Sequence, residues 1–459
     1  MKPGPGGVVA VTGTLRGGGR VGDAIIYGLG SDSTTTFVAL FDTTGIMLWV
    51  KEITGEFAVT AIAASTNMVA IGGKAFNPRT LFLDDLRISQ ELSQTTLYWF
   101  VLSRIDGTFR WFDRAGPAGR ESEAQRQITG LSFNSREELF TTGILRNSTT
   151  FSTRDTINVE VGHRIGYFTR HRKDGAMDFA QALYRPTDVS WAQMYAIDIL
   201  SDGPVLAGTA TGTVHFSDVD SISYGFGQSA FVVAFDRDGA FKWVTGVHGG
   251  GATFGDDVKV GLDRRIVFAG SYSASNTMRV GRFELHPTNN GRQGYFLEMN
   301  EFGDVTDLKT VTTSTGEQYL RTVALGSNRQ TYVGVSMADT ATFGAIRLVS
   351  TGESTAMLGC IGPPLPTVGG IYDHDDGPRI DLRGSILGIT LDGRWQAPLT
   401  VSAYSLLGER LVEDVVLSTG TASIEYAIPT SIIKQPAVII VRDASRGVAG
   451  HVFYMPSAR

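Results

Sequence analysis

Two acidic stretches contain residue types that could bind a hard cation. Asp236-Arg237-Asp238-Gly239 resembles the opening of a calcium loop, and Asp373-His374-Asp375-Asp376 is the densest group of possible ligands. A calcium loop needs acidic oxygens at alternating positions, a central glycine and a distant glutamate. No glycine and glutamate follow the second stretch at positions that complete such a loop, and adjacent side chains on an extended segment diverge. We therefore interpret residues 373–376 as a solvated acidic linker.

Other groupings that could support catalysis are incomplete. The histidines show neither H-x-x-x-H nor H-x-H spacing; they are His163, His171, His215, His248, His286, His374 and His451. The glycine-rich stretches 28–33 and 248–257 precede no helix that could present amides to phosphate, and no G-x-S-x-G nucleophile elbow occurs. Paired carboxylates for glycoside hydrolysis could converge only through the fold. The sequence predicts no catalytic residue, no cofactor-binding residue and no metal ligand.

A repeat of short apolar segments must position these residues. The pattern of the segment FVVAFDRDGAFKWV (231–244) recurs at 37–50, 99–112, 167–180 and 295–308. A more divergent sixth copy lies at 345–358. The shared glycines are Gly45, Gly107, Gly175, Gly239, Gly303 and Gly352, and the residues four positions later are Trp49, Trp111, Phe179, Trp243 and, as an exception, Asp307. We predict that these aromatic rings pack between repeats. The alternative is that they stack on carbohydrate.

Two further apolar runs accompany each copy. One ends in glycine, as in VVAVTG and VFAG, and the other precedes it, as in ITGLSF and DVKVGL. Four short strands per unit, repeated along the chain, are typical of propeller blades. We predict an all-β fold in which residues 1–361 form a β-propeller of about six blades. The first unit lacks the strand that should precede VVAVTG, so the chain is expected to begin inside a blade.

The repeat also decides between the two interpretations of residues 236–239. The equivalent positions read DTTG, RIDG, RKDG, DRDG, NEFG and VSTG, and only the glycine is common to all of them. Glycine supplies the positive φ that a strand-joining turn requires, and an aspartate before it can bond its own backbone. We predict that Asp236 and Asp238 are turn residues.

Composition limits the compartment and the partners. The chain has 459 residues, a net charge of −6 and a single cysteine, Cys360. The charge disfavours nucleic acid as the main partner, and one cysteine excludes an intramolecular disulfide. No apolar run is long enough to span a bilayer, and the N-terminus has no signal-peptide pattern. The protein is therefore cytoplasmic, or the chain begins after its export signal.

The C-terminal region has a different pattern. Residues 362–378 are rich in proline and glycine and read as a linker. Residues 379–459 contain short apolar segments without the repeat, and we predict a small immunoglobulin-like β-sandwich.

The repeated set resembles the bacterial β-propeller repeat family called SBBP, whose consensus runs approximately G-x-D-A-F-V-A-K-L-D-x-x-G-x-x-x-W and later V-Y-V-T-G. The matching segments are QSAFVVAFDRDGAFKWV and IVFAGSY. GTVHFSD (212–218) and TMRVGRFEL (277–285) resemble the extra hairpin of cell-surface versions. The resemblance covers residues 8–361 and implies an interaction or scaffold module.

The tail resembles the C-terminal sorting domain of type IX secretion cargo in Bacteroidetes-type bacteria. The matching segments are VSAYSLLGERLVE and PAVIIVRDASRGVAGHVFYM. The Pro-Asn-Pro start and the terminal lysines of that family are absent, and a flagellar-hook-type or generic immunoglobulin-like module is the alternative. The resemblance implies export across the outer membrane of a Gram-negative bacterium, with the secretion machinery as a partner.

These observations favour a secreted or cell-surface, non-enzymatic interaction protein whose propeller binds a protein or a glycan. One alternative is a polysaccharide hydrolase or lyase with acidic residues on the central face. The other is a structural component of a surface assembly.

Overall fold

The computed structural model of the chain is all β, with no α-helix among the residues it describes. The described residues are 2–3, 7–27, 34–42, 45–75, 80–83, 86–88, 95–118, 126–152, 155–160, 163–183, 185–186, 191–216, 221–223, 227–249, 251–273, 277–286, 291–313, 318–326, 330–337, 340–343, 346–349, 355–361, 379–383, 386–390, 399–405, 410–417, 423–427, 437–443 and 448–454. Within them, no helix is long and apolar enough to cross a membrane.

The chain divides into two compact units. The first comprises residues 1–268, 279–282 and 299–306, and the second comprises residues 269–278, 283–298 and 307–459. The domain boundaries predicted at 361 and 379 remain predictions, and the predicted linker 362–378 lies outside the described residues.

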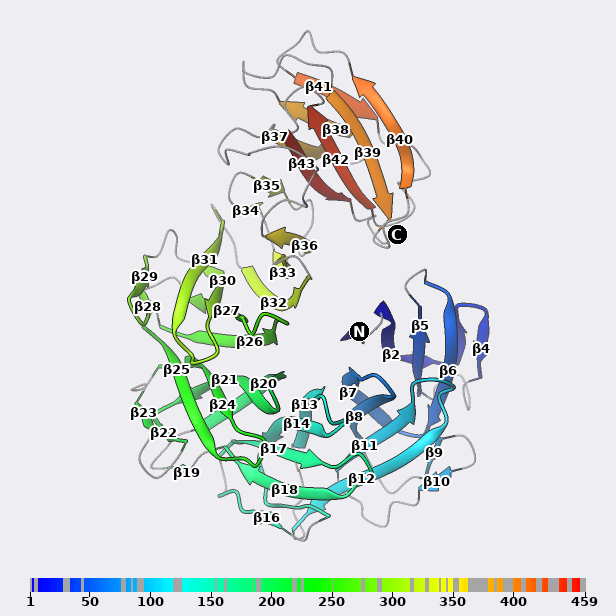
Figure 1. Cartoon of the computed structure of the whole chain (residues 1–459), viewed down its shortest axis with the longest axis vertical. Coiled ribbons are helices and arrows are strands. Elements are labelled where there is room, and N and C mark those ends of the chain that lie inside the picture. Colours follow the sequence, from blue (N-terminus) through cyan, green and yellow to red (C-terminus); the bar gives the residue numbers. More distant parts are fainter. Residues whose placement is uncertain are drawn as a thin grey trace. The chain divides into compact units, whose positions relative to one another are not determined.

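The first unit is built from antiparallel sheets that follow one another in chain order, from blue to green in Figure 1. The first sheet has the order β1 (Lys2–Pro3), β2 (Val9–Arg16), β5 (Thr34–Phe41), β6 (Met47–Thr54), β9 (Leu81–Leu83), β10 (Leu86–Ile88). The second has the order β7 (Phe57–Ala64), β8 (Met68–Ala75), β11 (Thr96–Ser103), β12 (Phe109–Pro117), β15 (Thr149–Thr150), β16 (Thr156–Ile157). The third is β13 (Arg126–Phe133), β14 (Leu139–Leu145), β17 (Ile165–His171), β18 (Met177–Ala182).

The fourth sheet contains β20 (Trp191–Leu200), β21 (Gly203–Thr211), β24 (Ser229–Phe235) and β25 (Phe241–Gly249). The strands β26 (Thr253–Val260) and β27 (Ile266–Ser273) follow it. Smaller pieces are the hairpin β3 (Gly19–Val21) and β4 (Ala24–Ile26), and the sheet of β19 (Arg185–Pro186), β22 (Thr213–His215) and β23 (Ser221–Ser223).

The remaining strands belong mainly to the second unit, although their residues 279–280, 299 and 305–306 are in the first unit, and residues 269–273 of β27 are in the second. They are β28 (Met278–Val280, which straddles the boundary), β29 (Phe283–Leu285), β30 (Arg292–Met299), β31 (Val305–Thr313), β32 (Gln318–Leu325), β33 (Thr331–Met337), β34 (Thr340–Phe343), β35 (Ile346–Val349), β36 (Thr355–Ile361), β37 (Arg379–Arg383), β38 (Ile386–Thr390), β39 (Leu399–Ser405), β40 (Arg410–Leu417), β41 (Ser423–Ala427), β42 (Ala437–Asp443) and β43 (Val448–Tyr454). The last seven form two antiparallel sheets, β37-β38-β41 and β40-β39-β42-β43.

The first strands of successive sheets adjoin in the first unit. β1 contacts β7, β7 contacts β13, β13 contacts β20, and β20 contacts β26. The predicted absence of a first strand in the opening repeat is wrong. β1 occupies that place, with Lys2 paired to Ala10 and Pro3 to Val9. The sequence hid this strand because it is two residues long and ends in proline, which is tolerated at a sheet edge.

Insert hairpins join one repeat to the preceding one. The β9–β10 hairpin lies between β8 and β11 in the chain, yet β9 pairs with β6 of the first sheet, Ile53 opposite Leu83. β15 likewise pairs with β12 of the second sheet, Gly116 opposite Thr150. The inserts identified at 212–218 and 277–285 contain β22 and, in the second case, β28 and β29. Each pairing adds backbone hydrogen bonds across a repeat boundary.

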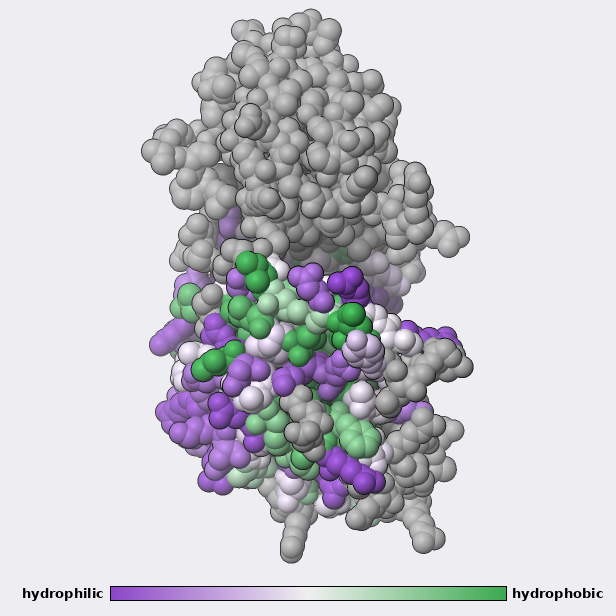
Figure 2. Space-filling model, turned by 90° about the vertical axis from the view of Figure 1, so that its right-hand side faces the viewer, coloured by the Kyte–Doolittle hydropathy of each residue, from purple (hydrophilic) through white to green (hydrophobic). Residues whose placement is uncertain are grey.

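Alternating side chains of one strand enter two cores. In β11, Tyr98 and Phe100 belong to the cluster that includes Leu40 and Trp49, whereas Trp99 belongs to a second cluster, toward the third sheet. A strand buried on both faces reads as a continuous apolar run, which explains the segment TLYWFVLS. The surface still carries apolar residues, and Figure 2 shows them in green among polar ones on the side it faces.

Candidate functional site

The turn at Asp236–Gly239 is held by its own aspartate. Asp236 Oδ1 accepts hydrogen bonds from the backbone N–H groups of Asp238 (2.9 Å) and Ala240 (2.8 Å). Gly239 has φ 89°, a conformation that favours glycine. The prediction that Asp236 is a turn residue is confirmed. No group of three or more potential metal ligands occurs among the described residues.

The neighbouring side chains of this turn reach the preceding repeat. Arg237 Nε donates to Glu138 Oε2 at 2.7 Å, and its Nη2 pairs with Oε1. Arg170 Nη1 donates to the Arg237 carbonyl (2.6 Å) and to Asp238 Oδ1 (2.7 Å). The hydrogen bond from Arg237 lowers the pKa of the Glu138 carboxyl to about 2, and the bond from Arg170 lowers the pKa of Asp238. These carboxylates are paired with arginine side chains of the protein.

Other turns at the same strand ends are linked in the same way. Arg136 Nη2 donates to Asp202 Oδ2 at 3.0 Å, and Ser135 Oγ donates to Asp202 Oδ1 at 3.1 Å. Ser65 Oγ donates to Glu137 Oε2. We call this surface the turn face; it comprises residues 42, 45–46, 65–67, 104–108, 134–138, 172–176, 201–202, 236–240, 261–265 and 300–304. Hydrogen bonds between repeats fix its turns relative to one another.

Large apolar side chains stand exposed on the turn face. Ile46 is 63% exposed, Ile105 81%, Phe302 70%, and Leu262 is fully exposed. Arg264 Nη1 pairs with Glu301 Oε2 at 2.8 Å, so the turns that carry Leu262 and Phe302 lie together. Exposed apolar side chains that lie together, as on the turns of Leu262 and Phe302, are typical of interaction surfaces.

The recurrent tryptophans pack against the turns of the next repeat. The indole N–H groups of Trp49, Trp111 and Trp243 donate to the carbonyls of Arg104 (2.8 Å), Lys173 (3.2 Å) and Glu301 (3.0 Å). A Cβ on Gly107 would lie 2.9 Å from the Trp49 ring, and one on Gly175 would lie 2.7 Å from Trp111. The repeat glycine therefore also leaves room for the ring. The rings pack between repeats, as predicted.

The first strands of the second, third and fourth sheets, β7, β13 and β20, share one irregularity. We call these strands, together with β26, the inner strands. The register shifts at Thr60 in β7, at Thr129 in β13 and at Tyr195 in β20. Thr60 Oγ1 donates to the carbonyl of Ile128 in the adjoining strand at 2.5 Å. Tyr195 donates to Gln193 Oε1 at 2.5 Å, and burial raises the pKa of its phenol. A bulge re-aims one side chain out of the ladder, so each bulge presents a polar group on the inner strands.

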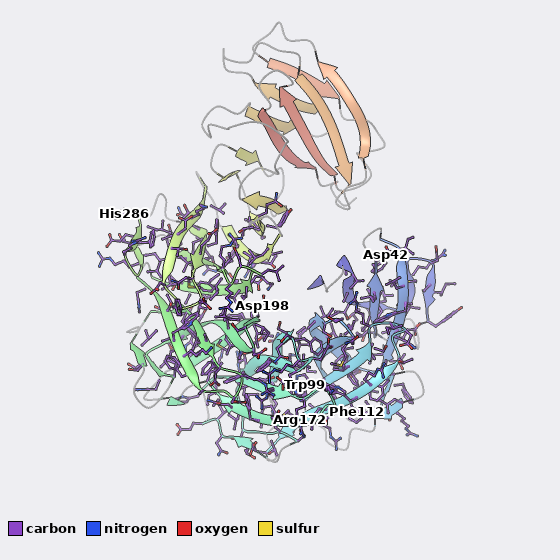
Figure 3. All side chains as sticks on the ribbon, viewed as in Figure 1. Asp42, Trp99, Phe112, Arg172, Asp198 and His286 are labelled. Carbon is purple, nitrogen blue, oxygen red and sulfur yellow. The ribbon has the colours of Figure 1, made fainter. Side chains whose placement is uncertain are left out.

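The inner-strand carboxylates have structural partners. Asp198, labelled in Figure 3, accepts hydrogen bonds from Ser132 Oγ (3.0 Å) and from the N–H of Val260 (2.9 Å). Lys259 Nζ donates to Asp257 Oδ1 at 2.5 Å. Burial tends to lower the pKa of Lys259, but Asp257 and Asp198 outweigh it and the pKa is raised. A lysine that stays charged is a poor general base. We therefore interpret the hydrogen bonds of Asp198 and Lys259 as structural contacts where β13, β20 and β26 meet.

A serine, a histidine and an aspartate meet between the second and third sheets without forming a nucleophile. His171 Nε2 lies 2.9 Å from Asp113 Oδ2, and Ser152 Oγ donates to the same oxygen at 2.7 Å. His171 is fully buried, with its ring centroid 5.3 Å from that of Trp99 and 5.5 Å from that of Trp111. The hydroxyl bonds the acid and not the imidazole, whereas a nucleophile must bond its base.

The other histidines and glycine-rich stretches considered in the sequence lie on separate elements or outside the described residues. His163 lies 4.0 Å from Glu160, and His286 bonds Thr277. His215 is in β22 and His248 is in β25. Residues 28–33, residues 373–376 and the side chain of His451 lie outside what the structure describes, and residues 248–257 span the end of β25 and the start of β26.

Comparisons with known proteins give little. No family model matches the chain, and no curated protein matches it. Among solved structures it is similar to TcdA4 of Morganella morganii, determined by cryo-EM, at 8% identity and a TM-score of 0.24, over 88% of this chain and 22% of that chain. It is also similar to PorZ of Porphyromonas gingivalis, described as an essential surface component of the type IX secretion system, at 8% identity and a TM-score of 0.14, over 92% and 91% of the chains. Similarity this low assigns neither fold nor function.

Proposed function

We propose that the repeats of residues 1–361 form a β-propeller of about six blades that acts as a non-enzymatic interaction module. The adjoining first strands, the inter-repeat tryptophans and the insert hairpins support this arrangement, because each recurs at the same place in successive repeats. Stacking sheets radially buries the faces that a single sheet would leave exposed.

The first sheet has one face that this arrangement would cover. Trp49 of β6 contacts the second sheet and is buried, whereas its neighbour Leu48 is exposed. Phe82 of β9 pairs with Thr54, on the face of the sheet opposite to the buried residues Ile53 and Leu83. Leu48 is 50% exposed and Phe82 42%. In a closed propeller a neighbouring blade would bury both side chains.

The exposed apolar side chains of the turn face carry the proposed function. Ile105, Leu262 and Phe302 are held on turns that hydrogen bonds fix in place. A preorganised apolar surface with charged groups around it suits a protein partner. The carboxylates Asp113, Glu138 and Asp198 are occupied by partners within the protein, which supports binding over hydrolysis.

The C-terminal region is proposed to be a sorting domain of the type IX kind. Its resemblance to that family falls on the strands β39, β40, β42 and β43, which pair as one antiparallel sheet. The proposal implies a protein secreted from, or attached to, the surface of a Gram-negative bacterium, and its partners then include the secretion machinery.

The test is capture of partners from the cell envelope of the source organism with matched variants. We expect Ile105→Asp/Leu262→Asp/Phe302→Asp to lose a partner that the unmodified chain retains. The control, Ile25→Asp/Tyr27→Asp, alters exposed apolar residues away from the turn face and should keep it. Equal capture by all three proteins would refute the turn face as the binding surface.

A further inference from the structure

Insert hairpins of four later repeats pair with a strand that precedes their own repeat. β9 pairs with β6, β15 with β12, β22 with β19, and β34 with β31. Each pairing is antiparallel, and each is made by the first strand of the hairpin. The outer edge of the first insert strand is therefore a place that an extended strand occupies again and again in this protein.

The hairpin of the first repeat has no such neighbour among the described residues. β3 and β4 form a two-stranded sheet of their own, with Arg20 paired to Ile25 and Val21 to Ala24. β3 is the first strand of its insert, as β9, β15, β22 and β34 are of theirs. An open strand edge is a template for pairing with another chain.

The β3–β4 hairpin is held against the first sheet. Ile26 in β4 is only 1% exposed. A Cβ on Gly19 would lie 3.2 Å from the Leu15 side chain in β2, and one on Gly22 would lie 3.6 Å from the Met47 side chain in β6. Two strands alone are marginally stable in water, so we attribute the order of the hairpin to these contacts. A preformed edge lowers the entropy cost of adding a strand.

The backbone of Arg20 is directed to the open edge. Only Gly22 and Asp23 connect the two strands, and Gly22 has φ 56°, as two-residue hairpin loops require. In such a turn the residues on either side form a hydrogen-bonded pair, here Val21 and Ala24. Hydrogen-bonded and non-hydrogen-bonded pairs alternate along antiparallel strands. In the next pair, the N–H and C=O of Arg20 therefore point away from β4.

The outer face of the hairpin carries exposed apolar side chains. Ile25 is 54% exposed and Tyr27 is 73% exposed. They are two residues apart and so share a face, and Ile25 is paired with Arg20. In the β9–β10 hairpin, the residue in the middle pair at the place of Ile25 is the exposed Arg87. An apolar residue where another repeat has a charged one suits a surface that a partner covers.

We propose that the outer edge of β3 binds an extended segment of a partner protein, which adds to the hairpin as a third, antiparallel strand. Main-chain hydrogen bonds to Arg20 would set the register, and apolar side chains of the segment would cover Ile25 and Tyr27. An acidic residue opposite Arg20 would add a favourable cross-strand pair. A second copy of this chain is a poor occupant, because pairing two β3 strands about their centres would place one Arg20 opposite the other.

This edge is separate from the turn face. β3 belongs to the connection between β2 and β5, the second and third strands of its repeat, whereas the turn face is made from the other two hairpin connections. The two proposals can therefore fail independently.

The experiment measures binding of the full chain to a fluorescent peptide with the sequence of β31, VTDLKTVTT, the strand with which β34 pairs. We expect saturable binding and at least a tenfold loss in Arg20→Pro, which removes the outward N–H. Arg20→Lys keeps the N–H and the charge and should bind as the unmodified chain does. No binding at the highest soluble peptide concentration, or equal binding by Arg20→Pro, would overturn the proposal.

Two further variants separate this edge from the turn face. Ile25→Asp/Tyr27→Asp should bind the peptide less tightly although it keeps the turn-face partner. The turn-face variant should bind the peptide normally; it is Ile105→Asp/Leu262→Asp/Phe302→Asp. Loss of the peptide in the turn-face variant alone would overturn the assignment of the edge.

Two N-methylated forms of the peptide separate strand addition from other modes of binding. A strand at an edge uses only every second N–H to pair with it. Methyl groups on one alternate set of N–H groups should abolish binding, and those on the other set should leave it intact. Equal binding of the two forms would show that no strand is added.

Hydrogen exchange of the Arg20 amide in the full chain tests whether the edge is open. We expect fast exchange without peptide and slower exchange once the peptide is bound. Slow exchange without peptide would show that the chain itself covers the edge, and would overturn the proposal.

Discussion

Arg237 forms a two-point ion pair with Glu138, a residue 99 positions earlier in the chain, and so joins the hairpin turns of successive repeats. Glu138 is only 7% exposed, and Asn134 also donates to it at 2.7 Å. The turn that resembled a calcium loop therefore contributes a cation to an acid of its neighbour. Its function is to connect repeats.

The Glu138 pair predicts an acid-sensitive term in stability. The pKa of Glu138 falls from 4.5 to about 2 in the folded protein. A carboxyl with a depressed folded pKa contributes stability that is fully present above its unfolded pKa and is lost as pH falls toward the folded value. Urea unfolding between pH 5 and pH 2 should therefore show a decline that is smaller in Glu138→Gln.

The matched control for this prediction is Glu301→Gln. Glu301 also pairs with an arginine, Arg264, but its side chain is 34% exposed, and exposed pairs contribute little. Its pH profile should follow that of the unmodified chain. An unchanged profile in Glu138→Gln would contradict the assignment.

Alanine at Gly107 should destabilise the protein more than alanine at Gly281. Both glycines have positive φ, 69° and 53°, but a Cβ on Gly107 would lie 2.9 Å from the Trp49 ring, whereas one on Gly281 would meet nothing within 4 Å. We expect a loss of about 1 kcal/mol for Gly281→Ala from the backbone alone, and roughly 3 kcal/mol for Gly107→Ala once the clash is added. Denaturant unfolding of the two variants gives the difference; equal losses would show that the ring does not constrain the turn.

Leu48→Asp and Phe82→Asp test closure of the proposed propeller. If a neighbouring blade covers the free face of the first sheet, each change buries a charge and should cost roughly 3 kcal/mol or more. Ile105→Asp, on the exposed turn face, should change stability by less than about 0.5 kcal/mol. The denaturant midpoints of the three variants distinguish a covered face from an open one. Similar small shifts in all three would mean that the free face of the first sheet stays open to solvent.

The sequence was sufficient for features that recur at a fixed spacing. The turn at Gly239 and the packing of Trp49 and Trp111 could be predicted because one conformation and one ring position return in successive repeats. The strand β1 was missed because two residues carry no periodicity. The inter-repeat pairing of β9 with β6 could not be predicted, since the insert that contains β9 follows the next strand of the chain and pairs backward.

The candidate sites depend on contacts that sequence spacing does not reveal. Glu138 and Arg237 belong to turns of different repeats, and neither stands out in its own segment. The edge of β3 stands out only when the pairings of the other insert hairpins are known. The sequence hides those pairings, because the inserts differ in length and in sequence from one repeat to the next.

Replacing His171 should show that its contact with Asp113 is structural. The imidazole is fully buried beside Trp99 and Trp111, and it bonds an acid whose side chain is 11% exposed. His171→Ala leaves a cavity and a carboxylate without its main partner, and we expect a loss of roughly 3 kcal/mol. His286→Ala, an exposed histidine, should change stability by less than about 0.5 kcal/mol. If His171→Ala unfolded at the same denaturant concentration as the unmodified chain, the histidine would not be part of the packing between the second and third sheets, and its conjunction with Ser152 and Asp113 would need another explanation.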